Sequence, residues 1–124
     1  MEATENVGGT SLQGYIKASY EQLLQTFGAP NPNLCDNYKT DVEWAFKFAD
    51  GTVATLYNWK NGHNYLGEAE GLELNDIYEW NVGGFNEKAV SRLLEKLRSQ
   101  QKKINLWMKQ ASEVTREENE KEKI

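Results

Sequence analysis

Apolar and polar residues alternate most strictly between Val42 and Trp59, and this alternation predicts a β-hairpin. Apolar side chains occupy every second position from Val42 to Phe48, as a strand with one buried face requires. Asp50-Gly51 follows, the dipeptide preferred in two-residue hairpin turns. Such a loop pairs apolar residues with apolar or β-branched ones: Phe48 with Val53, Phe46 with Thr55, Trp44 with Tyr57, and Val42 with Trp59. We therefore expect Tyr57 and Trp59 to share the buried face with Trp44 and Phe46.

Two further strands and a short helix flank this hairpin. The segments 12–18 and 76–82 alternate in the same way and predict strands, the second of which ends at Gly83-Gly84. A helix is expected over residues 20–27, because Ser19 and Gln22 have capping-box spacing and Gly28 supplies a left-handed stop. Residues 60–75 open with Gly and Asn turn signals, which predicts a long loop.

The chain ends in a predicted helix over roughly residues 86–116, with Asn86 as its cap. Its core positions follow a heptad: Val90, Leu97, Ile104 and Ala111 recur every seven residues, and Leu93, Gln100, Trp107 and Val114 fall three later. At 1.5 Å per residue this helix is longer than the roughly 30 Å width of the head formed by residues 1–85. Its far end is therefore expected to be an oligomer interface, made of Ile104, Trp107, Met108, Ala111 and Val114.

Together these elements predict one α+β domain, which a chain of 124 residues suits. It contains a small antiparallel sheet, one short packed helix over residues 20–27 and a long C-terminal helix over 86–116. Residues 1–10 are expected to be a flexible leader, because they are polar and contain Gly8-Gly9. Residues 11–85 then form the sheet and the short helix, and residues 86–124 form the long helix with a frayed, charged tail.

The net charge of −5 conceals an uneven distribution. Residues 1–85 carry four basic and twelve acidic side chains, whereas residues 86–110 carry seven basic and two acidic ones. One interpretation of the basic helix is an ordinary solvated face. The other is that it docks on the acidic head of a neighbouring subunit or on an acidic partner. An acidic head disfavours direct binding of nucleic acid, whose backbone attracts basic surfaces.

The sequence predicts a cytoplasmic protein. No apolar run reaches the ~20 residues that a membrane span needs. The N-terminus does not show a basic segment followed by an apolar one, so no signal peptide is expected. Cys35 is the only cysteine, which rules out an intrachain disulfide and suits a reducing compartment.

Catalytic and metal-binding patterns are missing from the sequence. His63 is the only histidine, with no second histidine or nearby cysteine to share a metal and no Ser-His-Asp order around it. Cys35 has no histidine near it in the sequence to act as a base. We therefore expect no catalytic residues, no metal and no cofactor, and a protein that is not an enzyme.

Two segments are candidates for binding a small ligand. Residues 57–65 combine aromatic, amide and basic groups that can stack on a ring or base, with candidate contacts at Trp59, Lys60, Asn61, His63 and Tyr65. The alternative is that Tyr57 and Trp59 belong to the core. The turn before the last helix is a candidate anion site, with Trp80, Gly83, Gly84 and Asn86. It lacks a complete phosphate-binding motif, so a plain strand-to-helix turn is the alternative there.

Three motifs occur together within residues 10–90: Glu43-Trp44-Ala45-Phe46-Lys47-Phe48, the run from Asp50-Gly51-Thr52-Val53 to Trp59-Lys60, and Trp80-Asn81-Val82-Gly83-Gly84. In these motifs the chain resembles a group of small accessory proteins encoded by bacteriophages. The resemblance carries no assigned activity and no functional residue. It implies a protein that acts in the cytoplasm of a bacterial host, where such proteins often inhibit defence systems.

The function expected from these observations is that of a non-enzymatic inhibitor or adaptor. It binds a host protein and assembles with copies of itself through the C-terminal helix. The alternative is an oligomeric sponge that holds a small nucleotide between residues 59–65 and the turn at residues 80–86.

Overall fold

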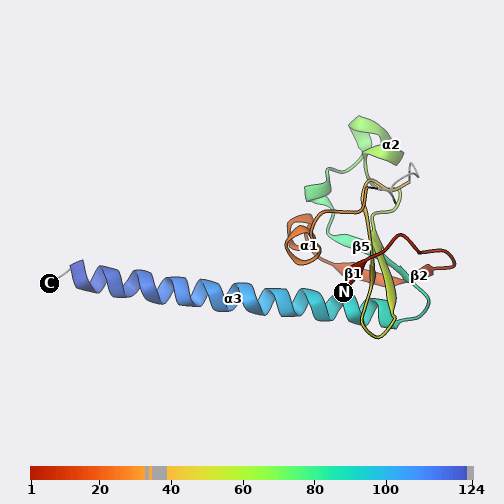
Figure 1. The fold of residues 1–124 in the computed structure, drawn as a ribbon. Coiled ribbons are helices and arrows are strands. Elements are labelled where there is room, and N and C mark those ends of the chain that lie inside the picture. The colour runs from red at the N-terminus through yellow and green to blue at the C-terminus, as the bar shows by residue number, and fades with distance from the viewer. Residues whose placement is uncertain (33, 35–38, 123–124) are drawn as a thin grey trace.

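In the part of the chain that the structure describes, five strands form one antiparallel sheet with helices against it (Figure 1). The computed structural model describes residues 1–32, 34 and 39–122, and of residues 115–122 the backbone only. The strands lie in the spatial order β1-β3-β4-β5-β2. Their bounds are β1 (Glu2–Ala3), β2 (Ser11–Lys17), β3 (Glu43–Lys47), β4 (Val53–Tyr57) and β5 (Glu79–Gly84). The predicted α+β class is confirmed.

One face of the sheet is buried beneath α1 (Tyr20–Phe27) and the first turns of α3 (Lys88–Glu122). Trp44 and Leu56 on this face are almost completely buried, as is Trp80 of β5. Leu93 of α3 is fully buried against them. The hydrophobic core therefore lies between the sheet and the two helices.

The start of the short helix is built as its sequence predicts. Ser19 Oγ accepts a hydrogen bond from the Gln22 backbone N–H, and the Gln22 side chain accepts one from the Ser19 N–H. These two bonds complete the capping box. Gly28 ends the helix at φ 78° and ψ −164°, an extended conformation with positive φ that glycine adopts without strain, and not the left-handed helical stop that was predicted.

Two tryptophans fasten the ends of α1 to the sheet. The Trp44 indole N–H donates to the Gly28 carbonyl at 2.9 Å, and the Trp80 indole N–H donates to the Ala18 carbonyl at 2.9 Å. The two indoles meet edge to face with centroids 5.9 Å apart, and the Tyr20 ring lies 6.1 Å from each. The predicted burial of Trp44 beneath the short helix is confirmed.

The β3–β4 hairpin forms, but its predicted register is wrong by one residue. Trp44 pairs with Leu56 and Phe46 pairs with Ala54. Because side chains alternate between faces, this shift sends Tyr57 to the face opposite the helices. The expectation that Tyr57 shares the core with Trp44 is therefore wrong.

The cause of the shift is the length of the hairpin loop. The Phe48 N–H donates to the Thr52 carbonyl at 2.8 Å, and the Gly51 N–H donates to the Phe48 carbonyl at 2.9 Å, which leaves three residues in the loop. Gly51 has a φ of 87°, as expected, but it fills the left-handed position after a turn that begins at Phe48. Asp-Gly suits this three-residue loop as well as the predicted two-residue turn.

β5 continues through the glycines that were expected to end it. Gly83 pairs with Thr55 and Gly84 pairs with Ala54, both within the sheet ladder. A Cβ at Gly84 would lie 2.6 Å from the Cβ of Ala89, so glycine lets the start of α3 pack closely on the sheet. The predicted strand-to-helix turn forms, but it follows the glycines, at residues 85–87.

Residues 1–10 are not outside the fold, as a leader would be. Glu2 pairs with Lys47 and Ala3 pairs with Phe46, which makes β1 an edge strand beside β3. Pairing with an exposed strand edge satisfies backbone groups of β3 that would otherwise remain open. The predicted domain boundary at residue 10 is therefore misplaced.

The predicted loop over residues 60–75 contains α2 (His63–Glu70) and the single turn η1 (Leu74–Asp76). The local sequence gives α2 no side-chain cap. Asp41, distant in the sequence, supplies it: its carboxylate accepts hydrogen bonds from the backbone N–H groups of His63 at 3.1 Å and Asn64 at 3.2 Å. A local pattern does not contain this capping group.

α3 is anchored at its start and then leaves the head as a long rod (Figure 1). The Asn86 side chain accepts a hydrogen bond from the Lys88 N–H, as its predicted role in capping requires. Arg92 donates two hydrogen bonds to Asp50 in the hairpin loop. The Thr52 N–H, the Thr52 side chain and then Arg92 hold the pKa of Asp50 well below its usual range. The helix begins two residues later than expected and spans 35 residues.

Candidate functional site

A pocket of about 230 Å³ opens on the sheet face opposite α1 and α3. It lies over β4 and β5, and the segments next to β2 and β3 form its walls. Residues lining it are Thr10, Ser11, Leu34, Thr40, Glu43, Thr55, Tyr57, Trp59 and Gly83. We call it the sheet-face pocket.

Aromatic rings and lysines gather at the Trp59 side of this pocket. The rings of Tyr57 and Trp59 meet edge to face with centroids 6.1 Å apart. The Nζ atoms of Lys39 and Lys60 lie 5.4 Å and 5.8 Å from the centroid of the Trp59 ring. Lys60 also lies 5.5 Å from the Tyr65 ring. Trp59 is 41% exposed, and the two ammonium groups lie over its ring, so an exposed aromatic side chain and two positive charges meet at one place.

The backbone that carries these groups is held by a buried amide. Asn58 is fully buried, and its Oδ1 accepts hydrogen bonds from the N–H groups of Asp41 at 2.7 Å and Val42 at 3.2 Å. Its Nδ2 donates to Asn61 Oδ1 at 3.1 Å. The chain leaving β4 is thereby fixed to the segment that precedes β3, which sets the position of Trp59.

Tyr57 and His63 have altered acidity in this region. Burial raises the pKa of Tyr57, and the neighbouring Glu43 and Tyr15 add to the effect, so the phenol stays neutral and can donate a hydrogen bond. The pKa of His63 is raised because the Gly67 carbonyl and then the Glu73 carboxylate accept hydrogen bonds from its ring. Charged His63 stabilises the α2 turn below about pH 6.5, and this contribution is lost as the pH rises through the raised pKa.

Only some of the predicted ligand contacts come together. Trp59, Lys60 and Tyr65 form one cluster, and Gly83 lines the same pocket as Trp59. Asn61 and His63 lie next to this cluster but make internal hydrogen bonds, to Asn58 and Glu73.

The other predicted contacts lie elsewhere. Trp80 is fully buried on the helix-covered face, and Gly84 packs against the start of α3. Asn86 caps α3, and its Oδ1 accepts a hydrogen bond from the Lys88 N–H. The combined site of residues 59–65 with the turn at residues 80–86 does not form as predicted.

Sequence reasoning missed Tyr57, Thr55 and Lys39 as parts of the sheet-face pocket or its rim. The predicted hairpin register placed Tyr57 and Thr55 on the buried face, so neither was expected at a pocket. One signal favours the correct register: it places Leu56 and Ala54 on the buried face, whereas the predicted register leaves both on the polar face. Lys39 comes from a distant segment, and nothing in the local sequence indicated its approach to Trp59.

The second candidate surface is the part of α3 that extends beyond the head. Trp107 is 69% exposed, Met108 57% and Val114 55%. Ala111 is exposed and Ile104 is half-buried. We call these residues, Ile104, Trp107, Met108, Ala111 and Val114, the distal stripe. All five predicted interface positions therefore lie where the head does not cover them fully.

Comparison with protein-family models, curated proteins and solved structures finds no match to this chain. Among the described residues, no three His, Cys, Asp or Glu side chains converge as a metal site requires. Within the same residues, no helix is both long and apolar enough to cross a membrane, since α3 carries charges along its whole length. Cys35 lies outside the described residues.

Proposed function

We propose that this protein is a non-enzymatic accessory protein of the bacteriophage type, an inhibitor or adaptor that binds a host protein in the bacterial cytoplasm. It works as a homo-oligomer joined through α3 and presents its acidic heads to the partner. The observation that carries the proposal is the distal stripe, an apolar surface held away from the protein's own core.

The exposure of this stripe is the main support. Soluble proteins rarely leave a contiguous row of large apolar side chains in water, and such rows usually mark interfaces. Trp107 and Met108 sit next to each other in this row and are each more than half exposed. Heptad spacing suits a second helix as the occupant, because side chains seven residues apart return to the same face.

Light scattering on the full-length chain tests the oligomer. At tens of micromolar we expect the mass of a dimer or a larger species. Trp107→Glu is expected to yield the monomer mass, because it places a charge in the centre of the stripe. Leu106→Glu is the matched control: Leu106 is 57% exposed but lies on the other side of α3, about 160° round the helix from Ile104 of the stripe. It should keep the wild-type mass.

Two results would contradict the oligomer. One is a monomer mass for the wild-type chain at these concentrations. The other is an equal loss of mass in Trp107→Glu and Leu106→Glu, which would indicate general damage to α3 instead of a specific face.

The acidic charge of the head supports the proposed binding of a host protein. Residues 1–85 have eight more acidic than basic side chains, which attracts a basic surface and speeds encounter with it. Glu68 and Glu70 are exposed on α2, which lies at the end of the head away from α3 (Figure 1). A host protein captured by the wild-type chain should be lost when both are changed to lysine. It should be retained when the exposed Glu113 of α3 is changed instead.

The sheet-face pocket favours a second candidate function, the sequestration of a small nucleotide. Trp59 is 41% exposed, and the two lysines over its ring bring positive charge to the same place. The pocket volume of about 230 Å³ lies below the ~300–1,000 Å³ of most ligand sites, so it suits a single ring more than a whole dinucleotide. For this reason the protein-partner function is preferred.

Incubation with nucleoside mono-, di- and triphosphates and with cyclic dinucleotides separates the candidates. If the pocket binds one of them, Trp59→Ala should weaken binding about 5- to 150-fold, the equivalent of ~1–3 kcal/mol of stacking. Trp107→Ala, a change of the same size at another exposed tryptophan, should leave the affinity unchanged. Intact ligand released on denaturation supports a sponge, and altered ligand would indicate an enzyme. No binding removes this second candidate.

A further inference from the structure

The same face of α3 packs on the sheet near the start of the helix and is exposed farther along. Leu93 is fully buried against the sheet, and Leu97 packs partly buried on the same core. Trp107 and Ala111 follow Leu93 and Leu97 by fourteen residues, or two heptads. Residues seven apart drift by only about 20° round an α-helix, so the distal stripe continues the face that the head covers.

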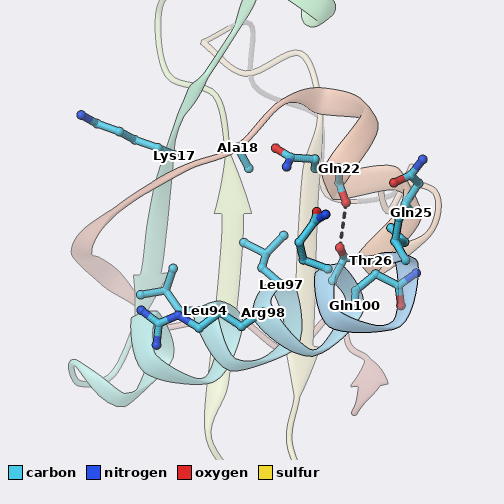
Figure 2. Close-up of a pocket in the computed structure, with 11 residues that line it drawn as sticks. Lys17, Ala18, Gln22, Gln25, Thr26, Leu94, Leu97, Arg98 and Gln100 are labelled. Carbon is cyan, nitrogen blue, oxygen red and sulfur yellow. Dashed lines mark hydrogen bonds between the residues drawn. The ribbon is translucent and has the colours of Figure 1, made fainter. Parts of the chain in front are cut away.

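A pocket marks the junction between the covered and the uncovered part of this face (Figure 2). It holds about 220 Å³ and lies between α1 and α3. Figure 2 shows Gln22, Gln25 and Thr26 of α1 on one side and Leu97 and Gln100 of α3 on the other. The exposed face therefore runs directly into a recess that α1 closes on its far side. We call this recess the α1–α3 pocket.

This arrangement restricts how a second α3 can lie on the distal stripe. In a parallel, in-register pair, the two helices face each other along their whole length, including Leu93 and Leu97. That stretch already faces the protein's own sheet, so the second copy's head would occupy the same space as the first. An antiparallel pair that crosses near Trp107 sets Val114 of one copy beside Gln100 of the other, at the α1–α3 pocket, and places the two heads at opposite ends.

The distribution of charged residues along α3 also favours the antiparallel pair. Residues 88–109 carry seven basic side chains and one acidic one, whereas residues 113–122 carry five acidic and two basic ones. An antiparallel pair sets the acidic end of one helix beside the basic part of the other, and a parallel pair sets like charges together. The dipoles of antiparallel helices also oppose each other favourably.

We infer that two copies of this chain pair antiparallel through the distal halves of α3, with the α1–α3 pocket of each copy receiving the end of its partner's distal stripe. The inference rests on the proposed function, because it takes the distal stripe as the oligomer interface. It adds the direction of the pair and a second contact surface, α1. The assembled protein then carries two acidic heads at the two ends of one rod, which suits a partner with two equivalent basic sites.

Distances between spin labels on the two copies test the direction. Ser91 and Gln110 are both exposed, and each is changed to cysteine and labelled in a chain whose Cys35 is replaced by serine. With Trp107 near the crossing point, the Ser91 positions lie about 48 Å apart along the axis and the Gln110 positions about 9 Å, at 1.5 Å per residue. We therefore expect a long distance from the Ser91 label and a much shorter one from the Gln110 label.

The outcomes are distinct. Short and similar distances from both labels, in a species with dimer mass, overturn the antiparallel pair and leave the proposed oligomer intact. A monomer mass with no label-to-label coupling overturns the oligomer itself, and the inference with it.

Charge variants on α1 test the second contact. Gln25 is exposed at the α1–α3 pocket, where the acidic end of the partner helix arrives. Gln25→Lys should lower the dimer dissociation constant severalfold, and Gln25→Glu should raise it severalfold. The same two changes at Gln13, a half-buried residue of β2 away from α1, are the control, and the Lys and Glu variants there should have the same dimer dissociation constant. Equal effects of Lys and Glu at Gln25 would contradict the contact.

Discussion

Trp44→Ala is expected to lower the free energy of unfolding by ~3–5 kcal/mol, the usual cost of truncating a buried aromatic side chain. Trp44 is 1% exposed and touches both Tyr20 and Trp80. Its indole N–H also bonds the Gly28 carbonyl at the end of α1. The substitution therefore removes core volume and one of the two bonds that fasten α1 to the sheet. Urea unfolding followed by circular dichroism measures the loss.

Trp59→Ala is the matched control for this experiment. It removes the same side chain from the opposite face of the sheet, where Trp59 is 41% exposed. Its cost should stay under about 1 kcal/mol, as for most surface substitutions. A near-wild-type midpoint for Trp44→Ala, or equal losses in the two variants, would show that the two faces of the sheet are assigned wrongly.

The contrast between these two tryptophans shows what the sequence reveals and what it hides. Alternation placed Trp44 in the core correctly, because β3 has one apolar and one mixed face. Trp59 was predicted to lie beside it, since Asp50-Gly51 suits two loop lengths that differ by one residue. A shift of one residue exchanges the faces of the following strand, so the sheet-face pocket was not predicted as a unit.

The helix caps show the same contrast: some come from neighbouring residues and one comes from a residue distant in the sequence. The caps of α1 and α3 come from Ser19 and Asn86, residues next to the helices they cap, and both were predicted. The cap of α2 comes from Asp41, more than twenty residues away. Local patterns do not contain such a contact, and this is why residues 60–75 were expected to be a loop.

The α3 surface was predictable for a geometric reason. A helix longer than the head that supports it leaves its far apolar positions in water, whatever the details of the sheet. Trp107 at 69% exposed fits that argument, and Leu93 at 0% fits the expectation that the near end packs on the sheet. The α1–α3 pocket was not predicted, because it depends on where α1 lies relative to α3.

Gly84→Ala is expected to lower the free energy of unfolding by ~1–3 kcal/mol through overpacking. A Cβ at Gly84 would lie 2.6 Å from the Ala89 Cβ and 3.0 Å from the Val53 carbonyl oxygen. Both contacts are too close, and neither neighbour is a flexible side-chain end that can rotate away. The strain falls where α3 joins the sheet, so the start of α3 must move. Chemical unfolding of the purified variant measures the cost.

Gly8→Ala is the control for Gly84→Ala, because a Cβ there meets nothing within 4 Å and the backbone is not left-handed. It should change stability by less than about 0.5 kcal/mol. Ala89→Gly supplies a stricter test when it is combined with Gly84→Ala. It removes the methyl group that the new Cβ meets, so the double variant should lose less stability than the sum of the two single variants. Strict additivity would show that α3 does not start its packing at Gly84, and the anchoring of the projecting helix would then need another basis.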